Sequence, residues 1–154
     1  MSGSDQALAQ RDANVRRIVY DAFISRGVAA LRAEVAAQLS LPDPDIAASF
    51  ERLAEGRVLV LQPESREILM ANPFSAVPTS FQVTSGAKSW WGNCIWDALG
   101  IIAMIGGNGA VETSCPDCGE ALTLTVEDGH LLATEAIAHF AVPAARWWDD
   151  IVFT

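Results

Sequence analysis

The apolar residues of this chain change their spacing after residue 56, and this change constrains the fold more than any other feature of the sequence. Before that point, three stretches place apolar side chains three or four positions apart, which is the spacing of one helix face. Their members are Val15, Ile18, Val19, Ala22 and Phe23, then Leu31, Val35 and Leu39, then Ile46, Phe50 and Leu53. Two short apolar runs follow, Val58 to Leu61 and Glu67 to Met70, around a Gln-Pro-Glu-Ser turn. Three helices and a hairpin predict a winged-helix-like bundle over residues 1–72.

Glycine and aspartate mark the expected ends of these helices. Gly27 and Gly56 follow the first and third stretches, where glycine commonly ends a helix. Pro42 lies in a turn, after which Asp43 or Asp45 is expected to cap the third helix through its carboxylate.

The remainder of the chain, residues 73–154, predicts a second domain built on a mixed or antiparallel sheet. Alternating or β-branched runs predict strands, and one apolar stretch beginning at about Cys94 predicts a helix that packs on the sheet and ends before Gly106-Gly107-Asn108-Gly109. The expected strands are Phe81–Thr84, Val111–Ser114, Leu122–Val126 and Ile137–Val142, with the start of another at Ile151–Phe153. Because chain termini are usually polar, an apolar strand at the end predicts that the natural chain continues past Thr154. A helical part followed by a part built on a sheet predicts the fold class α+β.

Charge and hydropathy exclude several classes of partner. The net charge of −9 repels phosphate backbones, so nucleic acid is not expected as the main partner. The third helix would enter the groove in a DNA-binding winged helix, yet it begins Asp43-Pro44-Asp45, which argues against a winged-helix regulator. The longest apolar run, Ala98–Ile105, is far shorter than the roughly 20 residues of a membrane span. With no secretory leader in the opening residues, we expect a cytoplasmic protein without a membrane partner. The oligomeric state stays open.

The stretch from Trp90 to Gly100 carries the most chemistry. Asn93 is expected to be the N-cap of the helix, which places Cys94 in its first turn and Asp97 three positions later. Side chains at i and i+3 share a helix face, so thiol and carboxylate are expected side by side. A helix N-terminus favours a thiolate, and the carboxylate can accept the thiol proton and deliver it elsewhere. The alternative is a buried structural cysteine, because a Cys-x-x-Asp pair alone is not specific.

In this setting the chain resembles the alkylmercury lyase (organomercurial lyase) family. The resemblance rests on the Asn-Pro-Phe-Ser segment from Asn72, on Asn93-Cys94-x-Trp-Asp97-Ala-Leu-Gly, on Ser114-Cys115 with Gly119, and on Trp147-Trp148-Asp149-Asp150-Ile151. The family also carries a winged-helix-like domain before its catalytic domain. The resemblance implies protonolysis of a carbon–mercury bond, with Cys94 binding mercury as thiolate and Asp97 transferring the proton and contacting the metal.

The chain departs from the family pattern in one important respect. The family uses a second catalytic cysteine well downstream, and no cysteine follows Cys118 in this sequence. One-thiol cleavage is expected to be slow, with mercury held weakly. Whether the 154-residue chain is an active enzyme is therefore left open. The alternative is a non-catalytic protein that binds a soft metal or organometal through Cys94 and Cys115/Cys118. The expected partners are a small organometal substrate and cellular thiols, and no cofactor is required.

Cys115-Pro116-Asp117-Cys118 forms a second cluster. A Cys-x-x-Cys turn is half of a typical zinc site, but His130 and His139 are separated by eight residues and lie outside the usual ligand spacing. A structural zinc at Cys115/Cys118 is therefore disfavoured, and so is a redox dithiol, since no helix follows. The resemblance gives Cys115 a structural role. Cys118 is the candidate substitute ligand for mercury if the fold brings it near Cys94.

Two further features have competing interpretations. His139 lies between apolar neighbours, which favours a hydrogen-bonded core histidine; a Cys94–His139 hydrolase is disfavoured because no oxyanion-hole signature is present. The five tryptophans are expected to pack in the core, and some are candidates to wall an apolar pocket for an organic group. They are Trp90, Trp91, Trp96, Trp147 and Trp148.

Overall fold

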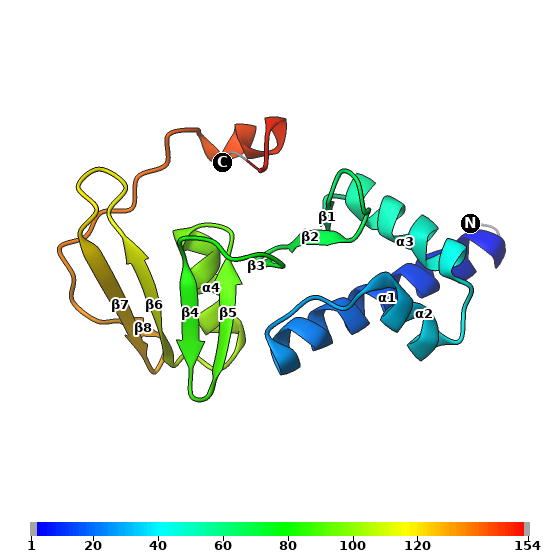
Figure 1. Ribbon diagram of the computed structural model, residues 1–154, viewed down its shortest axis with the longest axis horizontal. Coiled ribbons are helices and arrows are strands. Elements are labelled where there is room, and N and C mark those ends of the chain that lie inside the picture. Colours follow the sequence, from blue (N-terminus) through cyan, green and yellow to red (C-terminus); the bar gives the residue numbers. More distant parts are fainter. Residues whose placement is uncertain (1–2, 153–154) are drawn as a thin grey trace.

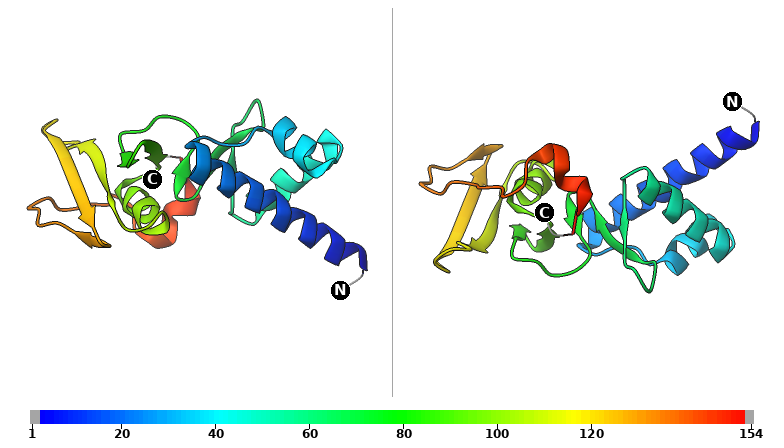
Figure 2. Two further views of the ribbon diagram at one scale, coloured as in Figure 1. Left: turned by 90° about the horizontal axis from the view of Figure 1, so that it is seen from below. Right: turned by 90° about the horizontal axis from the view of Figure 1, so that it is seen from above.

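The computed structural model describes residues 3–152, and its first three helices lie at the opposite end from the larger part of the sheet (Figure 1). Helices α1 (Gly3–Arg26), α2 (Arg32–Leu39) and α3 (Asp43–Glu55) form one end, and the strands from β4 (Gln82–Ser85) to β8 (His130–Leu131) form the other. Two further views show α1 extending away from the sheet, with its N-terminal half at the far end of the molecule (Figure 2). The α+β class predicted from the change of apolar spacing is confirmed.

Helices α1 and α3 bury the faces that the apolar spacing predicted, whereas in the second stripe only Val35 is buried and Leu31, the N-cap of α2, is 56% exposed. All five members of the first stripe are buried in α1, and the third stripe is buried in α3. Helix α1 ends at Arg26, and the next residue, Gly27, has a φ of 77°, in the left-handed region that glycine adopts without strain. A side chain there would also meet the backbone oxygen of Ser89, so this position needs a glycine for two reasons.

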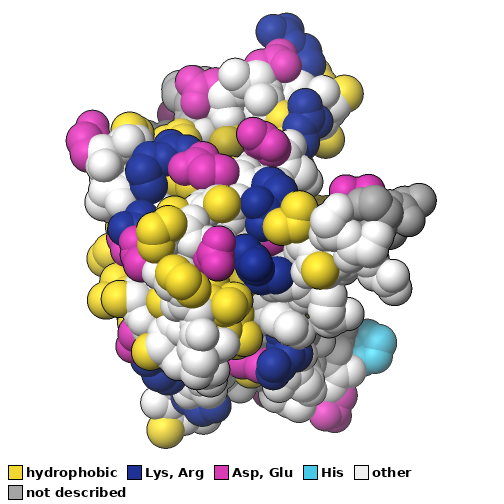
Figure 3. Space-filling model, turned by 90° about the vertical axis from the view of Figure 1, so that its right-hand side faces the viewer, with side chains coloured by type: hydrophobic (Ala, Val, Ile, Leu, Met, Phe, Trp, Pro, Cys, Tyr) yellow, Lys and Arg dark blue, Asp and Glu magenta, His cyan; other side chains and the backbone are white. Residues whose placement is uncertain are grey.

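The predicted aspartate cap of α3 is wrong. The N-cap is Pro42, which makes no side-chain cap bond, and Asp43 already lies in the first turn. Its carboxylate accepts a hydrogen bond from Arg32 at 2.8 Å, while Asp45 pairs with Arg11 at 3.1 Å. These acids therefore serve contacts between helices, and Figure 3 shows basic and acidic side chains interspersed over this end of the molecule.

Within the described residues, the strands form an eight-stranded sheet of order β1-β2-β3-β5-β4-β6-β7-β8. Every neighbouring pair is antiparallel, which confirms the antiparallel alternative. Strands β3, β5 and β8 were not predicted. Two residues, as in β3 and β8, are too few to show alternation, and the Lys-Ser-Trp-Trp-Gly sequence of β5 has no alternating apolar pattern. The bounds are β1 Val60–Leu61, β2 Ile68–Ala71, β3 Phe74–Ser75, β4 Gln82–Ser85, β5 Lys88–Gly92, β6 Gly109–Ser114, β7 Ala121–Glu127 and β8 His130–Leu131.

Helix α4 (Ile95–Met104) packs on the sheet through three fully buried side chains, Ala98, Ile101 and Ile102. The strand before it comes very close, since a Cβ on Gly92 would lie 2.7 Å from the backbone nitrogen of Ala98. The glycines after the helix end it as predicted, with φ values of 123° and 78° at positions 106 and 107. This close approach between Gly92 and Ala98 holds the first turn of α4 against β5, and Cys94 lies in the short connection between them.

The two strands expected near the C-terminus are wrong in the described residues. Residues 137–142 adopt no regular structure, and Ile137 is 90% exposed because no neighbouring strand pairs with this segment. A short 3₁₀ helix, η1 (Ala144–Asp149), follows, and Ile151 and Val152 form a turn. Phe153 lies outside the described residues. An alternating pattern makes a strand only where a sheet edge offers hydrogen bonds.

The helical end and the sheet share buried contacts. The rings of Phe23 in α1 and Phe74 in β3 stack at a centroid distance of 5.0 Å, and the indole of Trp90 donates to the Phe23 carbonyl at 2.7 Å. The division at residue 72 remains a prediction. No helix in residues 3–152 is both long and apolar enough to cross a membrane.

Candidate active site at the start of α4

Cys94 is itself the N-cap of α4, one position later than predicted. Its backbone is extended (φ −146°, ψ −179°), and its Sγ accepts a hydrogen bond from the Asp97 amide at 3.5 Å. The expectation that Asn93 caps the helix is wrong, because the Asn93 side chain has other partners. The sulfur therefore takes the place that a Ser, Thr or Asp oxygen usually fills at this position.

Asp97 lies beside the cysteine, as the i, i+3 spacing predicted. The Cys94 thiol hydrogen-bonds to the Asp97 carboxylate, and this contact lowers the pKa of the acid while it raises the pKa of the thiol. Two groups that exchange a proton need this kind of direct contact.

Burial outweighs the helix terminus in setting the charge on both groups. Desolvation raises the pKa of the Cys94 thiol, the Asp97 charge raises it further, and hydrogen bonds from the Asp97 and Trp96 amides offset only part of this. Desolvation also raises the pKa of Asp97, against hydrogen bonds from Asn93 and Cys94. The helix N-terminus was expected to favour a thiolate, but the buried site favours the neutral thiol.

The amide group of Asn93 ties this pair to the preceding turn. Its Nδ2 lies 3.1 Å from Asp97 Oδ2, 2.9 Å from Asn72 Oδ1 and 3.3 Å from the Pro73 carbonyl oxygen. All three partners are acceptors, so the orientation of the amide is determined: a flipped amide would set its oxygen against three oxygens. Asn93 Oδ1 is buried and has no hydrogen-bond partner among residues 3–152.

The network reaches helix α1 through Tyr20. The Tyr20 hydroxyl donates to the Asn72 carbonyl oxygen at 2.8 Å. Burial raises the pKa of Tyr20, and the charge of Asp97 raises it further. Tyr20, in the first helix, thus holds the turn at Asn72 and Pro73, and oxygens of this turn accept hydrogen bonds from Asn93. Sequence reasoning missed Tyr20, Asn72 and Asn93 as members of the site, and only the Asn-Pro-Phe-Ser resemblance pointed to the turn.

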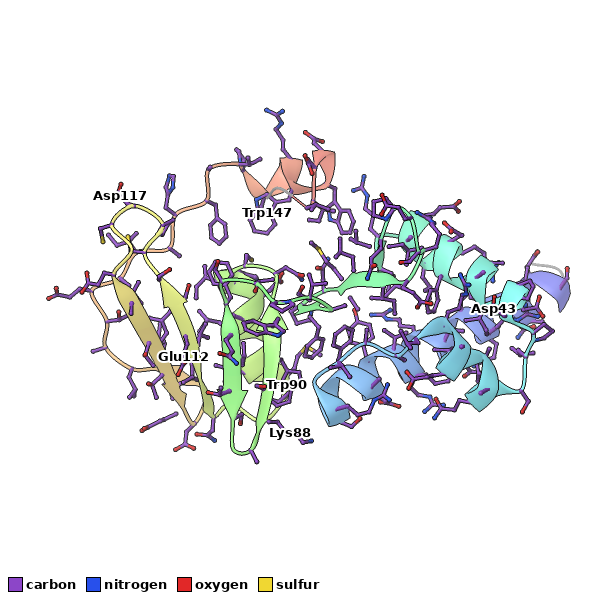
Figure 4. All side chains as sticks on the ribbon, viewed as in Figure 1. Asp43, Lys88, Trp90, Glu112, Asp117 and Trp147 are labelled. Atoms are coloured by element: carbon purple, nitrogen blue, oxygen red, sulfur yellow. The ribbon has the colours of Figure 1, made fainter. Side chains whose placement is uncertain are left out.

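Cys94 and Asp97 line a cavity of about 520 Å³. One side is formed by the start of α4 and by the turn after β2, and the other by residues 139–152. Trp147 projects from η1 toward the body of the molecule (Figure 4). The residues around the cavity are mostly apolar, with few polar groups beside Asp97. They are Met70, Asn72, Phe81, Asn93, Cys94, Ile95, Trp96, Asp97, His139, Phe140, Ala141, Val142, Trp147, Trp148, Ile151 and Val152.

His139 and the tryptophans differ from expectation. His139 is exposed at the cavity mouth, so the prediction of a core histidine is wrong. Trp90 is buried as predicted, whereas Trp96 is 69% exposed and lines the cavity with Trp147 and Trp148. Three of the five tryptophans therefore line the cavity, as expected for side chains that would contact an organic group.

Cys115 and Cys118 lie elsewhere, on the loop between β6 and β7. Neither lines the cavity, so the structure does not bring Cys118 to Cys94. In the part of the chain described, no group of three or more His, Cys, Asp and Glu side chains could hold a metal ion.

Two of three comparisons with known proteins find a match. A family model described as alkylmercury lyase (MerB) matches residues 74–154. The solved structure of the mercury-bound form of MerB2 matches with a TM-score of 0.63 and 21% sequence identity, over 82% of this chain and 60% of that one. At this identity the match shows a common fold, and the chain spans about 60% of the length of that protein. No curated protein matches. Because the family model covers more than half of its residues, this chain belongs to the alkylmercury lyase family.

Proposed function

We propose that this chain cleaves the carbon–mercury bond of organomercurials by protonolysis, with Cys94 as the mercury-binding sulfur and Asp97 as the proton carrier. The observation that carries the proposal is the Cys94 sulfur at the start of α4, hydrogen-bonded to the Asp97 amide at 3.5 Å and lining a largely apolar cavity together with the Asp97 side chain. Thiolates bind soft metals, which explains the sulfur, and apolar walls suit an organic group.

In the first step, the organomercurial exchanges its thiol ligand for Cys94. The Cys94 thiol proton passes to the Asp97 carboxylate, sulfur bonds to mercury, and the previous thiolate leaves. The raised pKa of Cys94 means that the free site holds a neutral thiol, so an adjacent base is needed. Asp97 is that base, and the step leaves it protonated in a site where burial already favours its neutral form.

In the second step, Asp97 gives the proton to the carbon bonded to mercury. The electron pair of the carbon–mercury bond becomes the new carbon–hydrogen bond, and the hydrocarbon leaves. Mercury stays on Cys94 with the Asp97 carboxylate beside it as counter-charge, until cellular thiols remove it. Asn93 holds this carboxylate in place throughout, since its amide donates to Oδ2.

The experiment measures bound mercury and released hydrocarbon separately. Each variant is incubated with a phenylmercury salt and excess small thiol, and mercury and benzene are quantified. Cys94→Ala is expected to lose mercury binding at the cavity. Asp97→Asn keeps the shape without the proton carrier, so binding survives and benzene release stops. Benzene release by Asp97→Asn at the unmutated rate would refute the role of the carboxylate.

The second candidate is a protein of the same fold that captures soft metals or organometals without turnover, through Cys94 and the Cys115/Cys118 pair. It is favoured by the exposed position of Cys118, which leaves a thiol accessible outside the cavity. Mercury bound by the unmutated chain without any benzene release would select this alternative. Cys118→Ser leaves the cavity untouched, so a loss of bound mercury in this variant would show that the Cys115/Cys118 pair contributes to capture.

The domain arrangement and location are part of the proposal. A winged-helix-like domain over residues 1–72 is supported by the order of three helices followed by the β1–β2 hairpin, with residues 73–154 as the catalytic domain. A cytoplasmic location is supported by the three free cysteines, which a reducing compartment preserves.

A further inference from the structure

The β6–β7 hairpin ends in a tight turn that contains both cysteines outside the cavity. The last paired residues are Ser114 and Ala121, and the Cys115 amide donates to the Glu120 carbonyl at 2.8 Å. Inside this bond, the Gly119 amide donates to the Cys115 carbonyl at 2.9 Å. These hydrogen bonds fold the chain back on itself and keep residues 115 and 118 on one turn.

The turn directs its donors at one sulfur. Hydrogen bonds from the Cys118 and Asp117 amides, and then from the Cys118 thiol, lower the pKa of the Cys115 thiol. Positions 115 and 118 thus lie three residues apart on one turn, and the amides stabilise negative charge on the first sulfur. Both thiols are free, Cys118 is exposed, and Figure 4 shows Asp117 at the tip of the hairpin, pointing away from the fold.

The number of ligands decides which metal suits this turn. Structural zinc takes four ligands, and no third His, Cys, Asp or Glu completes a group here among residues 3–152. Two thiolates alone satisfy a soft cation that prefers linear two-coordination, as the mercuric ion does. The turn supplies these two sulfurs and nothing further, so it matches that cation better than zinc.

We propose that Cys115 and Cys118 form a bidentate dithiolate site for a soft, two-coordinate cation of the mercuric type, separate from the cavity of Cys94. Binding forms two bonds from the cysteine sulfurs to the metal and breaks the two bonds to the thiolates that carried it. The two cysteine protons pass to those departing thiolates, without any change of oxidation state. The identification of the cation as the inorganic product of this chain rests on the proposed function, whereas the site itself does not.

Two sulfurs on one turn bind more tightly than two separate thiols. Once the first sulfur has bound, the second acts at an effective concentration in the millimolar range or above, as linked ligands do. A monothiol in solution must displace both. The pair is therefore expected to hold the cation against a modest excess of glutathione, while a single cysteine is not.

The test uses the Cys94→Ala chain, in which the pair supplies the remaining thiols. The chain is equilibrated anaerobically with mercuric chloride and excess glutathione, then desalted, and mercury per chain and free thiols are measured. One mercury per chain, with both thiols blocked, is expected. Cys94→Ala/Cys118→Ser and Cys94→Ala/Cys115→Ser should each lose at least about tenfold in affinity. Cys94→Ala/Glu112→Gln, which changes an exposed acid on β6 outside the turn, serves as control.

Three results would overturn the proposal. They are full retention by either serine variant, one mercury shared between two chains in size-exclusion chromatography, and zinc bound by the Cys94→Ala chain as tightly as mercury. Circular dichroism confirms that the serine variants are folded. Benzene release by the Cys118→Ser chain separates the two hypotheses, because it tests the cavity and is independent of the dithiol.

Discussion

Asn93 provides a sharp test of the site, because one amide group donates toward three acceptors. Asn93→Ala removes the contacts to Asp97 Oδ2, Asn72 Oδ1 and the Pro73 carbonyl, at 3.1, 2.9 and 3.3 Å. A hydrogen bond to a charged group is worth about 1.5–3 kcal/mol, against about 1 kcal/mol for one between neutral groups. The amide has two hydrogens and so makes two full hydrogen bonds at a time, one of them to the carboxylate. We expect a loss of about 2.5–4 kcal/mol in the free energy of unfolding at pH 7.

The pH dependence distinguishes the charged contact from simple packing. Burial raises the pKa of Asp97 in the folded chain, and removal of the Asn93 donor raises it further. Between the unfolded and folded pKa values, the folded state binds more protons, so the stability falls as the pH rises. Asn93→Ala widens this window. Its destabilisation is therefore expected to be larger at pH 7 than at pH 4, by about 1–2 kcal/mol.

Urea unfolding at pH 4, 5.5 and 7 measures this, and the matched control is a double-mutant cycle with Asp97→Asn. In the Asp97→Asn background, Asn93→Ala should cost the same at every pH, because no charge remains to be stabilised. If Asn93→Ala alone destabilised the chain equally at all three pH values, the argument that its amide stabilises the Asp97 carboxylate would be refuted.

Three other expectations follow from single contacts. Gly92→Ala should destabilise the chain by about 1–3 kcal/mol in thermal unfolding, because its Cβ would lie 2.7 Å from the Ala98 nitrogen; unchanged stability would contradict this packing. Trp90→Phe removes the 2.7 Å hydrogen bond between β5 and α1 and should cost about 1–3 kcal/mol, with a near-neutral effect as the contrary result. As the pH rises, iodoacetamide should modify Cys115 before Cys94, because amide hydrogen bonds lower the pKa of Cys115 and burial raises that of Cys94. Peptide mapping reads out the order, and reaction of Cys94 first would refute it.

The sequence by itself determined the elements whose signals are local. The helical stripes predicted α1, α2 and α3 because one buried face repeats every three to four residues, whatever the face packs against. For the same reason the spacing of Cys94 and Asp97 predicted their contact, since positions i and i+3 of a helix turn are neighbours in any fold. The resemblance added the family, which the comparison confirmed.

Tertiary structure alone decided which residues surround that pair. Asn93 lies 21 positions from Asn72, and Tyr20 lies 52 positions from it, so their hydrogen bonds depend on chain closure and leave no periodic signal. The segment at 137–142 has the alternation of a strand, yet it lines the cavity mouth because no sheet edge pairs with it. Cys118 is three positions from Cys115, which keeps the two on one turn, but its distance from Cys94 was set by the β6–β7 hairpin, a feature of pairing between strands.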